Sequence, residues 1–246
     1  MGPAGGRSRL ALSDKSLDSS IQGLYNDAAF LRPMIPGSAD LTYDKAVANT
    51  EKVLIKGRFS KADVFITRSG GRRFVVKDYS RKGPWERNLI GRIVIGREAR
   101  AYVALAGIDG LPTRFKRLSP LSLAVEYLEG KHLGAVERGE IGPDVIRQFE
   151  RIVHDLHDRG WVHLDLHRRT NILLIDGKVY VVDLASALHA GSVPLFGQCL
   201  TGLIGIADRL SLIKMKAIFV PGSLTKRERR WLRMRNGIMP TKWDSR

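Results

Sequence analysis

The chain is poor in cysteine and in aromatic residues. Of its 246 residues only Cys199 is a cysteine, and phenylalanine, tryptophan and tyrosine together make up 7%. One cysteine cannot form a disulfide within the chain, and it fits a reducing compartment, where such a residue usually serves as a small buried apolar side chain. Few aromatics, without zinc-ligand spacing or an RNA-recognition signature, argue against a nucleic-acid-binding module.

Acidic residues are scarce relative to basic ones. The chain has 25 aspartates and glutamates against 41 lysines and arginines, which gives a formal net charge of +16 and a pI of about 10.3. This excess favours an anionic partner: a nucleic acid, an acidic lipid surface or a phosphorylated glycolipid. Charge alone does not choose among them.

Long uninterrupted apolar runs are absent as well. The longest, 199–220, is broken by Asp208, Arg209, Lys214 and Lys216, which makes it too polar to cross a membrane. The first ten residues, MGPAGGRSRL, lack the apolar core of a signal peptide. We therefore expect a cytoplasmic protein, and 43% hydrophobic residues are enough for a buried core.

The stretch 163–183 concentrates the residues with the clearest chemistry. Two apolar runs, Ile-Leu-Leu-Ile and Val-Tyr-Val-Val, flank Asp176-Gly177, a pattern that predicts a β-hairpin. Asp165 and Asn171 precede the first strand and Asp183 follows the second, so three oxygen-bearing side chains are expected at one end of the hairpin. Phosphoryl transfer needs such a group: one carboxylate for the acceptor hydroxyl and two oxygen ligands for Mg²⁺.

Upstream, three strands with a glycine-bearing turn are expected. The runs 52–55 and 63–67 are strand-like and are joined by residues 57–62, which contain one glycine. Backbone N–H groups of such a turn can bind phosphates, although a single glycine also fits an ordinary hairpin. The next strand, 73–77, ends at Lys77.

With these motifs in this order, residues 50–190 resemble the protein-kinase-like superfamily. The likeness is closer to small bacterial kinases that phosphorylate heptose or 3-deoxy-manno-octulosonic acid of the lipopolysaccharide core, and to the RIO kinases. It implies an α+β, two-lobed fold: a loosely ordered extension over 1–45, a β-rich N-lobe over 46–125, a hinge over 126–130, and a mainly helical C-lobe with a basic tail over 131–246.

The resemblance also assigns three catalytic residues. Asp165 would position the acceptor hydroxyl and take its proton, and Lys77 would contact the phosphates of ATP. Glu98, in a helix expected over 88–106, matches the glutamate that orients this lysine. Glu86 is the rival carboxylate, but it follows Gly-Pro in a loop.

ATP and Mg²⁺ are the implied cofactors. Asn171 and Asp183 match the two metal ligands, and the turn and the hinge match the nucleotide site. The residues expected to bind the nucleotide are Gly57, Ser60, Lys61, Lys77, Glu126 and Leu128.

The loop after Asp165 departs from the family pattern. Asn171 follows Asp165 by six positions where the pattern has five, so that Thr170 occupies the expected place. Either the loop holds one extra residue, which we favour because Asn171 directly precedes the strand, or Asn171 is not the ligand. Arg168 and Arg169 would then lie in a bulge that faces an acidic acceptor. Solvated loop arginines are the alternative.

We therefore expect an ATP-dependent phosphotransferase acting on a hydroxyl, with a sugar of a lipopolysaccharide core as the favoured acceptor because the chain is basic. A RIO-like protein kinase is the nearest alternative. A pseudokinase and a basic nucleic-acid-binding module are the alternatives outside the enzyme class.

Two helical features complete the pattern. Pro143 opens a helix whose apolar residues repeat at helical spacing, and its His154 and His157 are more typical of packing than of a metal site. In the basic tail, Thr225 to Glu228 form a capping box. Cations there, interleaved with Trp231, suggest peripheral contact with the cytoplasmic face of the inner membrane, with a solvated helix face as the alternative.

Overall fold

The computed structural model describes residues 40–58, 60–137, 139–192 and 197–238. Helices and antiparallel strands are both present, so the expected α+β class is confirmed. In chain order the elements are α2 (Tyr43–Ala48), β1 (Thr50–Ile55), β2 (Asp63–Ser69), β3 (Arg72–Asp78), η2 (Glu86–Gly91), α3 (Arg92–Ala104), β4 (Phe115–Ser119), β5 (Ser122–Glu126), β6 (Lys131–His132), η3 (Leu133–Ala135), α4 (Pro143–Asp158), β7 (Trp161–Val162), η4 (Arg169–Asn171), β8 (Ile172–Ile175), β9 (Lys178–Val181), η5 (Leu184–Ser186), β10 (Leu188–His189), η6 (Ala190–Ser192), α5 (Gly197–Phe219), η7 (Pro221–Ser223) and α6 (Lys226–Ile238).

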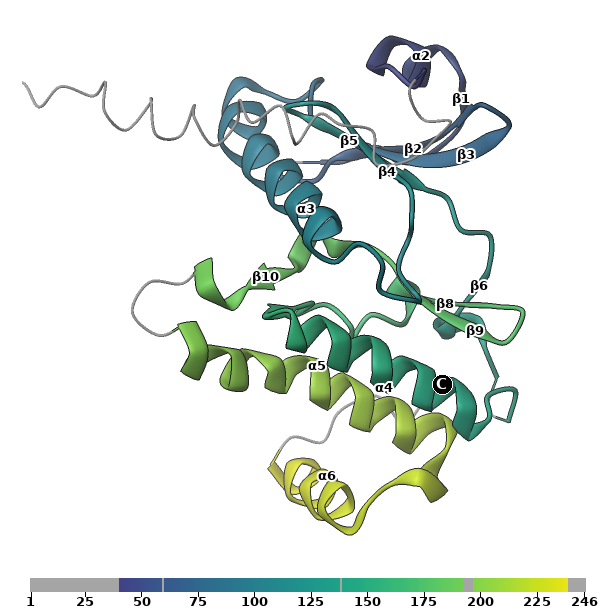
Figure 1. Ribbon diagram of the computed structural model, residues 1–246, viewed down its shortest axis with the longest axis vertical. Helices are drawn as coiled ribbons and strands as arrows, with labels where there is room; N and C mark the ends of the chain where they lie inside the picture. The colour runs from purple at the N-terminus through teal and green to yellow at the C-terminus, as the bar shows by residue number, and fades with distance from the viewer. Residues whose placement is uncertain (1–39, 59, 138, 193–196, 239–246) are drawn as a thin grey trace, which may run out of the picture.

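The N-terminal half is a five-stranded antiparallel sheet in the order β1-β2-β3-β5-β4. Side chains of β3 alternate between its two faces, as they do in any strand. Phe74 and Val76 are buried in a small apolar cluster on one face, and Lys77 therefore points to the other face, where α3 lies. Figure 1 shows α3 along this sheet.

Helix α2 covers the outer face of the sheet. Leu41 and Ala46 are fully buried there against Phe65, Phe74 and Val76. Leu41 and the start of α2, at the end of the segment expected as an extension, are packed on the sheet because their apolar side chains have a sheet face to cover. Residues 1–39 of that extension lie outside the described part.

The helix expected over 88–106 consists of a π-helical turn, η2, followed by α3. Gly91 joins the two and is buried against Tyr79: a Cβ added there would lie 2.6 Å from the Tyr79 Cβ. The absence of a side chain thus lets the helix approach the end of β3. This close approach determines where α3 lies against β3, and therefore where Glu98 lies relative to Lys77.

The C-terminal half is built on α4 and α5, which pack side by side below the sheet in Figure 1. As predicted, α4 begins at Pro143, and its buried face contains Val145, Ile146, Phe149, Ile152, Val153 and Leu156. The predicted hairpin is confirmed as β8 and β9, with Asp176 and Gly177 both at positive φ in the turn. The main hydrophobic core runs from α3 and β5 through β9 to α4 and α5 without interruption.

Helix α6 lies at the far end of the molecule from the sheet. Its predicted capping box is confirmed: the Thr225 N–H donates to Glu228 at 2.7 Å, and the Glu228 N–H donates to the Thr225 hydroxyl at 3.2 Å. Lys216 of α5 forms ion pairs with both Glu228 and Glu150, so one buried ammonium joins α4, α5 and α6. No helix in the described ranges is both long and apolar enough to span a membrane.

Candidate active site

Lys77 lies between two carboxylates that come from distant parts of the chain. Its Nζ is 2.6 Å from Oε1 of Glu98 on α3 and 2.6 Å from Oδ1 of Asp183, which follows β9. The Glu98 side chain is fully buried and that of Lys77 is 16% exposed. The structure thus brings together three of the residues selected from the sequence. The rival Glu86 accepts a hydrogen bond from the Gly83 N–H and stays at the start of η2.

Burial and charge act against each other in this cluster. Burial disfavours the ammonium of Lys77, but the charges of Glu98 and Asp183 outweigh it and hold the pKa of Lys77 above its ordinary value. Burial also acts to raise the pKa of Asp183, but the Lys77 charge prevails and lowers it. Burial raises the pKa of Glu98, while Lys77 opposes the rise. The Glu98 carboxylate therefore depends on Lys77 for its charged form.

Asp183 has an unusual backbone. Its φ of 67° and ψ of 74° lie in the left-handed region, and its carboxylate caps η5 by accepting the Ala185 N–H at 3.2 Å. Leu184 is fully buried, and Arg97 of α3 donates to the Ala185 carbonyl. Asp183 is therefore held toward Lys77 by its own turn and by α3.

Asp165 and Asn171 lie in direct contact. Asn171 Nδ2 donates to the Asp165 carbonyl at 3.1 Å and to its Oδ2 at 3.2 Å. Asn171 is buried, while Thr170 is exposed. The Val182 N–H also donates to the Asn171 carbonyl, so Asn171 and Asp183 lie at the same end of the hairpin. Of Thr170 and Asn171, it is therefore Asn171 whose side chain is buried against Asp165.

Two basic residues of the loop contact the Asp165 carboxylate. Arg168 Nε is 3.2 Å from Oδ1 of Asp165, and Nδ1 of His167 is 3.3 Å from the same oxygen. Both side chains are more than half exposed. Arg169 is half-buried in η4. Arg168 and His167 therefore lie beside Asp165, on the solvent side where an acceptor would approach.

The remaining residues expected to bind the nucleotide lie in the turn 57–62 and at the end of β5. Gly57 and Ser60 belong to a turn that folds onto the end of β3, where the Tyr79 hydroxyl donates to the Ser60 carbonyl at 3.0 Å, and Lys61 is exposed. The Glu126 side chain forms an ion pair with Arg114 at 2.7 Å, so it faces β4 and is not available to a ligand. Leu128 is half-buried just after β5.

Asp208 of α5 is a site residue that the sequence pattern did not reveal. Its carboxylate accepts the His163 N–H at 2.7 Å and the Leu164 N–H at 2.9 Å, and it is fully buried. His163, in turn, has Nε2 3.3 Å from the Val182 carbonyl. Asp208 could have been found from its position in the apolar run 199–220. An acid in such a run is expected to be buried, and a buried carboxylate needs hydrogen-bond donors.

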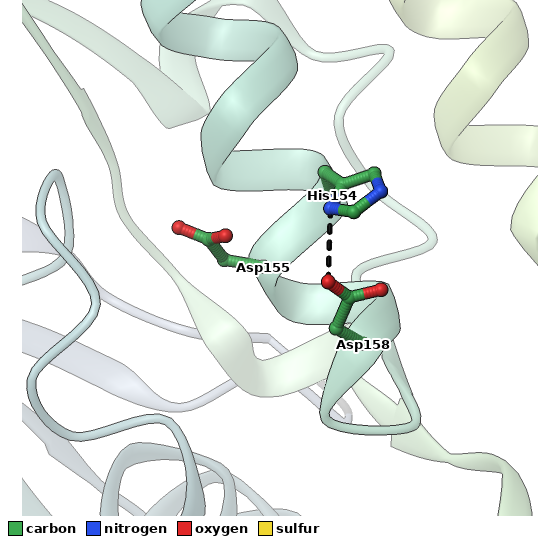
Figure 2. Close-up of side chains that lie close together, drawn as sticks. All are labelled: His154, Asp155 and Asp158. Atoms are coloured by element: carbon green, nitrogen blue, oxygen red, sulfur yellow. Dashed lines mark ion pairs between the residues drawn. The ribbon is translucent and has the colours of Figure 1, made fainter.

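The two histidines of α4 have separate partners. His157 Nε2 lies 3.1 Å from Oδ2 of Asp208, within the core of the C-terminal half. His154 points outward, with its Nδ1 2.9 Å from Oδ2 of Asp158 and Asp155 nearby, as Figure 2 shows. Residues His154, Asp155 and Asp158 are all exposed on about one helical turn. The position of His157 agrees with the packing role expected for these histidines, whereas His154 is exposed and does not pack.

Oxygen donors of the kind that bind Mg²⁺ are present at the end of the β8–β9 hairpin. The Asp183 carboxylate and the Asn171 amide oxygen are hard ligands from one end of the hairpin. Oε2 of Glu98 is buried without a hydrogen-bond partner among the described residues. The chemistry of these donors suits a divalent cation, and the Lys77 ammonium beside them suits an anionic group such as a phosphate.

No protein-family model matches the chain. Among curated proteins, it is 28% identical over 145 residues to the "Putative serine/threonine-protein kinase YrzF" of Bacillus subtilis (strain 168). The matched stretch is 58% of this chain and 63% of the relative, so less than two thirds of that protein is covered. The similarity supports a kinase-like relationship at the level of the superfamily and phosphotransfer in general terms. It does not extend to a lipopolysaccharide or RIO subgroup.

Proposed function

We propose that this chain is an ATP-dependent phosphotransferase with a two-lobed kinase-like fold. The observation that most supports this proposal is the position of the Lys77 ammonium between Glu98 and Asp183. Residues from β3, from α3 and from the end of the β8–β9 hairpin meet at this point. In this proposal the five-stranded sheet with α3 is the smaller lobe, residues 126–130 are the hinge, and α4 to α6 belong to the larger lobe.

The nucleotide would lie between the sheet and the β8–β9 hairpin. Lys77, oriented by Glu98, would contact its phosphates, and the turn 57–62 would cover them. Backbone groups of the hinge near Leu128 would bind adenine. Asn171 and Asp183 would hold Mg²⁺, which supplies charge neutralisation at the phosphates.

Asp165 would orient the acceptor hydroxyl and accept its proton. Its contact with Asn171 supports this role, because the acceptor carboxylate and the metal ligand then move as one unit. Arg168, whose Nε is 3.2 Å from the Asp165 carboxylate, would add positive charge at the acceptor side. A loose transition state requires little base strength from such a group.

The acceptor is proposed to carry negative charge as well as a hydroxyl. A phosphorylated or carboxylated sugar of the lipopolysaccharide core fits the basic surface and the loop arginines. A serine or threonine of a protein is the second candidate, and the name of the Bacillus relative favours it. Both acceptors would present a hydroxyl to the same catalytic residues. They would differ only in the contacts that the rest of the acceptor makes with the surface around the site.

A transfer assay with labelled ATP and Mg²⁺ tests the proposal. Two acceptor pools are compared, purified lipopolysaccharide core fragments and a protein mixture, with wild-type protein and the Asp165→Asn variant. We expect transfer to one pool and a loss of about 10² to 10⁴-fold in the variant, which keeps nucleotide binding. Nucleotide binding without transfer to either pool would indicate a pseudokinase. RNA binding with steep salt dependence and no ATP turnover would indicate that the protein is a nucleic-acid-binding module and not an enzyme.

Helix α6 is further proposed to make peripheral contact with an anionic lipid surface. Lys226, Arg227, Arg229, Arg230 and Arg233 are all exposed on it, whereas its only acid, Glu228, is bound to Lys216. Wild-type protein should sediment with phosphatidylglycerol vesicles and not with phosphatidylcholine vesicles. Replacing Arg227, Arg230 and Arg233 by glutamine should abolish sedimentation. Equal sedimentation of this variant would exclude α6 as the contact surface.

A further inference from the structure

A nearly enclosed ion pair lies at the base of the turn 57–62. Lys82 Nζ is 2.6 Å from Oδ1 of Asp63, at the start of β2. The two side chains are 10% and 25% exposed. Lys82 lies five residues beyond Lys77, in the segment that follows β3. The pair therefore connects the turn to the strand that carries the phosphate-contacting lysine.

This pair holds both backbone groups of Gly57. The Gly57 N–H donates to Oδ1 of Asp63 at 2.8 Å, and the Gly57 carbonyl accepts from Lys82 Nζ at 2.8 Å. Asp63 therefore binds the ammonium and the turn through one oxygen. Loss of either side chain would free a backbone group of Gly57, but only loss of Lys82 would also leave a carboxylate without its counter-charge.

The turn is also packed too tightly to rearrange without cost. A Cβ at Gly57 would lie 2.1 Å from the Lys61 carbonyl oxygen and 2.4 Å from that of Ala62, so no other residue fits this conformation. The hydrogen bond from Tyr79 to the Ser60 carbonyl holds the other side of the turn. Tyr79 and Lys82 thus hold the turn from the same short segment after β3.

We propose that Lys82 is a positioning residue for the nucleotide phosphates, acting through Asp63 and Gly57. The inference rests on the proposed function. Lys82 cancels the Asp63 charge, so the carboxylate can hold the Gly57 N–H without adding net negative charge to the turn. An uncompensated Asp63 would leave a negative charge at the turn proposed to cover the phosphates, and this charge would weaken ATP binding.

Three substitutions vary the net charge of the pair while side-chain size changes little. Lys82→Met leaves it at −1, Asp63→Asn at +1, and the double variant at zero. Asparagine retains an oxygen that can accept the Gly57 N–H. Lys178→Met, which removes an exposed lysine at the start of β9, is the matched control for overall charge.

The dissociation constants of Mg·ATP and adenosine are measured by isothermal titration calorimetry for all five proteins. Lys82→Met should weaken ATP binding about tenfold, which corresponds to the loss of one favourable charge contact, and leave adenosine within about twofold. Asp63→Asn should bind ATP as tightly as wild type or more tightly. The double variant should recover to within about threefold of wild type, because no charge then remains uncompensated. Lys178→Met should match wild type.

A merely structural role predicts a different pattern. If Lys82 only stabilises the turn, the double variant will bind ATP as weakly as Lys82→Met or more weakly, and adenosine binding will fall in parallel. Either result overturns the inference, as does unchanged ATP binding in Lys82→Met. If wild-type protein binds no nucleotide, the proposed function itself fails and the positioning role falls with it. Thermal unfolding of each variant verifies that binding is compared among folded proteins.

Discussion

Oδ2 of Asp208, near the middle of α5, accepts the backbone N–H of His163 at 2.7 Å. Its second oxygen accepts the next N–H, that of Leu164, at 2.9 Å. Leu164 has a φ of 65°, a conformation that leucine rarely adopts and that surrounding contacts must maintain. The buried carboxylate thus anchors the two peptide groups that precede Asp165 to a helix of the core.

The first prediction follows from this anchor. Asp208→Asn should lower the free energy of unfolding by about 1–3 kcal/mol, because one amide face cannot accept both N–H groups and one of them stays unsatisfied. Transfer should fall while nucleotide affinity changes little. Urea denaturation and the transfer assay measure the two effects. Asp155→Asn, an exposed acid on α4, is the control and should change stability by less than about 0.5 kcal/mol.

The second prediction concerns Lys77 and Glu98. A double-mutant cycle with Lys77→Met and Glu98→Gln, measured on ATP transfer, should be strongly non-additive, because each residue acts through the other. The second change should cost little once the first is present. Glu86→Gln serves as the matched control and should leave transfer unchanged. A harmful Glu86→Gln with a harmless Glu98→Gln would reverse the assignment of the carboxylate.

A third prediction addresses the loop arginines. Replacing Arg168 and Arg169 together by alanine should raise the acceptor KM and leave the ATP KM nearly unchanged, because the exposed Arg168 lies beside Asp165 and Arg169 follows it in the same loop. Steady-state kinetics with each substrate varied in turn separates the two constants. An equal loss for both substrates, or none, would mean that the bulge does not contact the acceptor.

The fourth prediction distinguishes Asn171 from Thr170. Asn171→Ala should raise the Mg²⁺ concentration needed for half-maximal transfer, because it removes an amide oxygen at the metal side of the hairpin. Thr170→Ala should leave the Mg²⁺ dependence unchanged, since Thr170 is exposed. The reverse pattern would show that Thr170 takes the ligand position and that the loop has no inserted residue.

The fifth prediction is a pH dependence of stability. Burial lowers the pKa of His163, and the nearby carboxylates of Asp208, Asp183 and Asp165 only partly oppose it. As the pH falls below the ordinary histidine pKa of about 6.5, the unfolded chain binds a proton that the folded chain does not, and stability falls until the folded pKa is passed.

The slope from this single site can reach about 1.4 kcal/mol per pH unit. Urea denaturation between about pH 5 and 8 measures it. His163→Gln should remove this contribution, whereas His154→Gln, on an exposed part of α4, should not. The idea fails if wild type and His163→Gln keep equal slopes. The hydrogen bond from the Asp165 N–H to Nδ1 is consistent with a neutral ring.

Local chemistry made several elements predictable. Asp176-Gly177 can adopt positive φ at low cost, so the hairpin follows from two residues. Pro143 starts α4 and Thr225 caps α6 because each supplies what a helix terminus needs within a few positions. In the same way, Lys77 was selected by its place near the end of an apolar strand, and it pairs with Glu98.

Other features depend on contacts between segments far apart in the chain. The sequence favoured Glu98 over Glu86, but the contact itself depends on the approach of α3 at Gly91, which lets the Glu98 carboxylate reach Lys77. Likewise, no spacing rule connects Asp208 to His163, 45 residues earlier.

The sequence alone therefore determined the hairpin, the helix ends and the identity of the charged groups, since these depend on neighbours within a few positions. The tertiary structure alone decided which charges meet. It buries Glu98 and Asp208 where only a specific partner can compensate for lost water. It also places the Asp63–Lys82 pair under Gly57, because packing and not local preference determines the distance between strands and the segments that follow them.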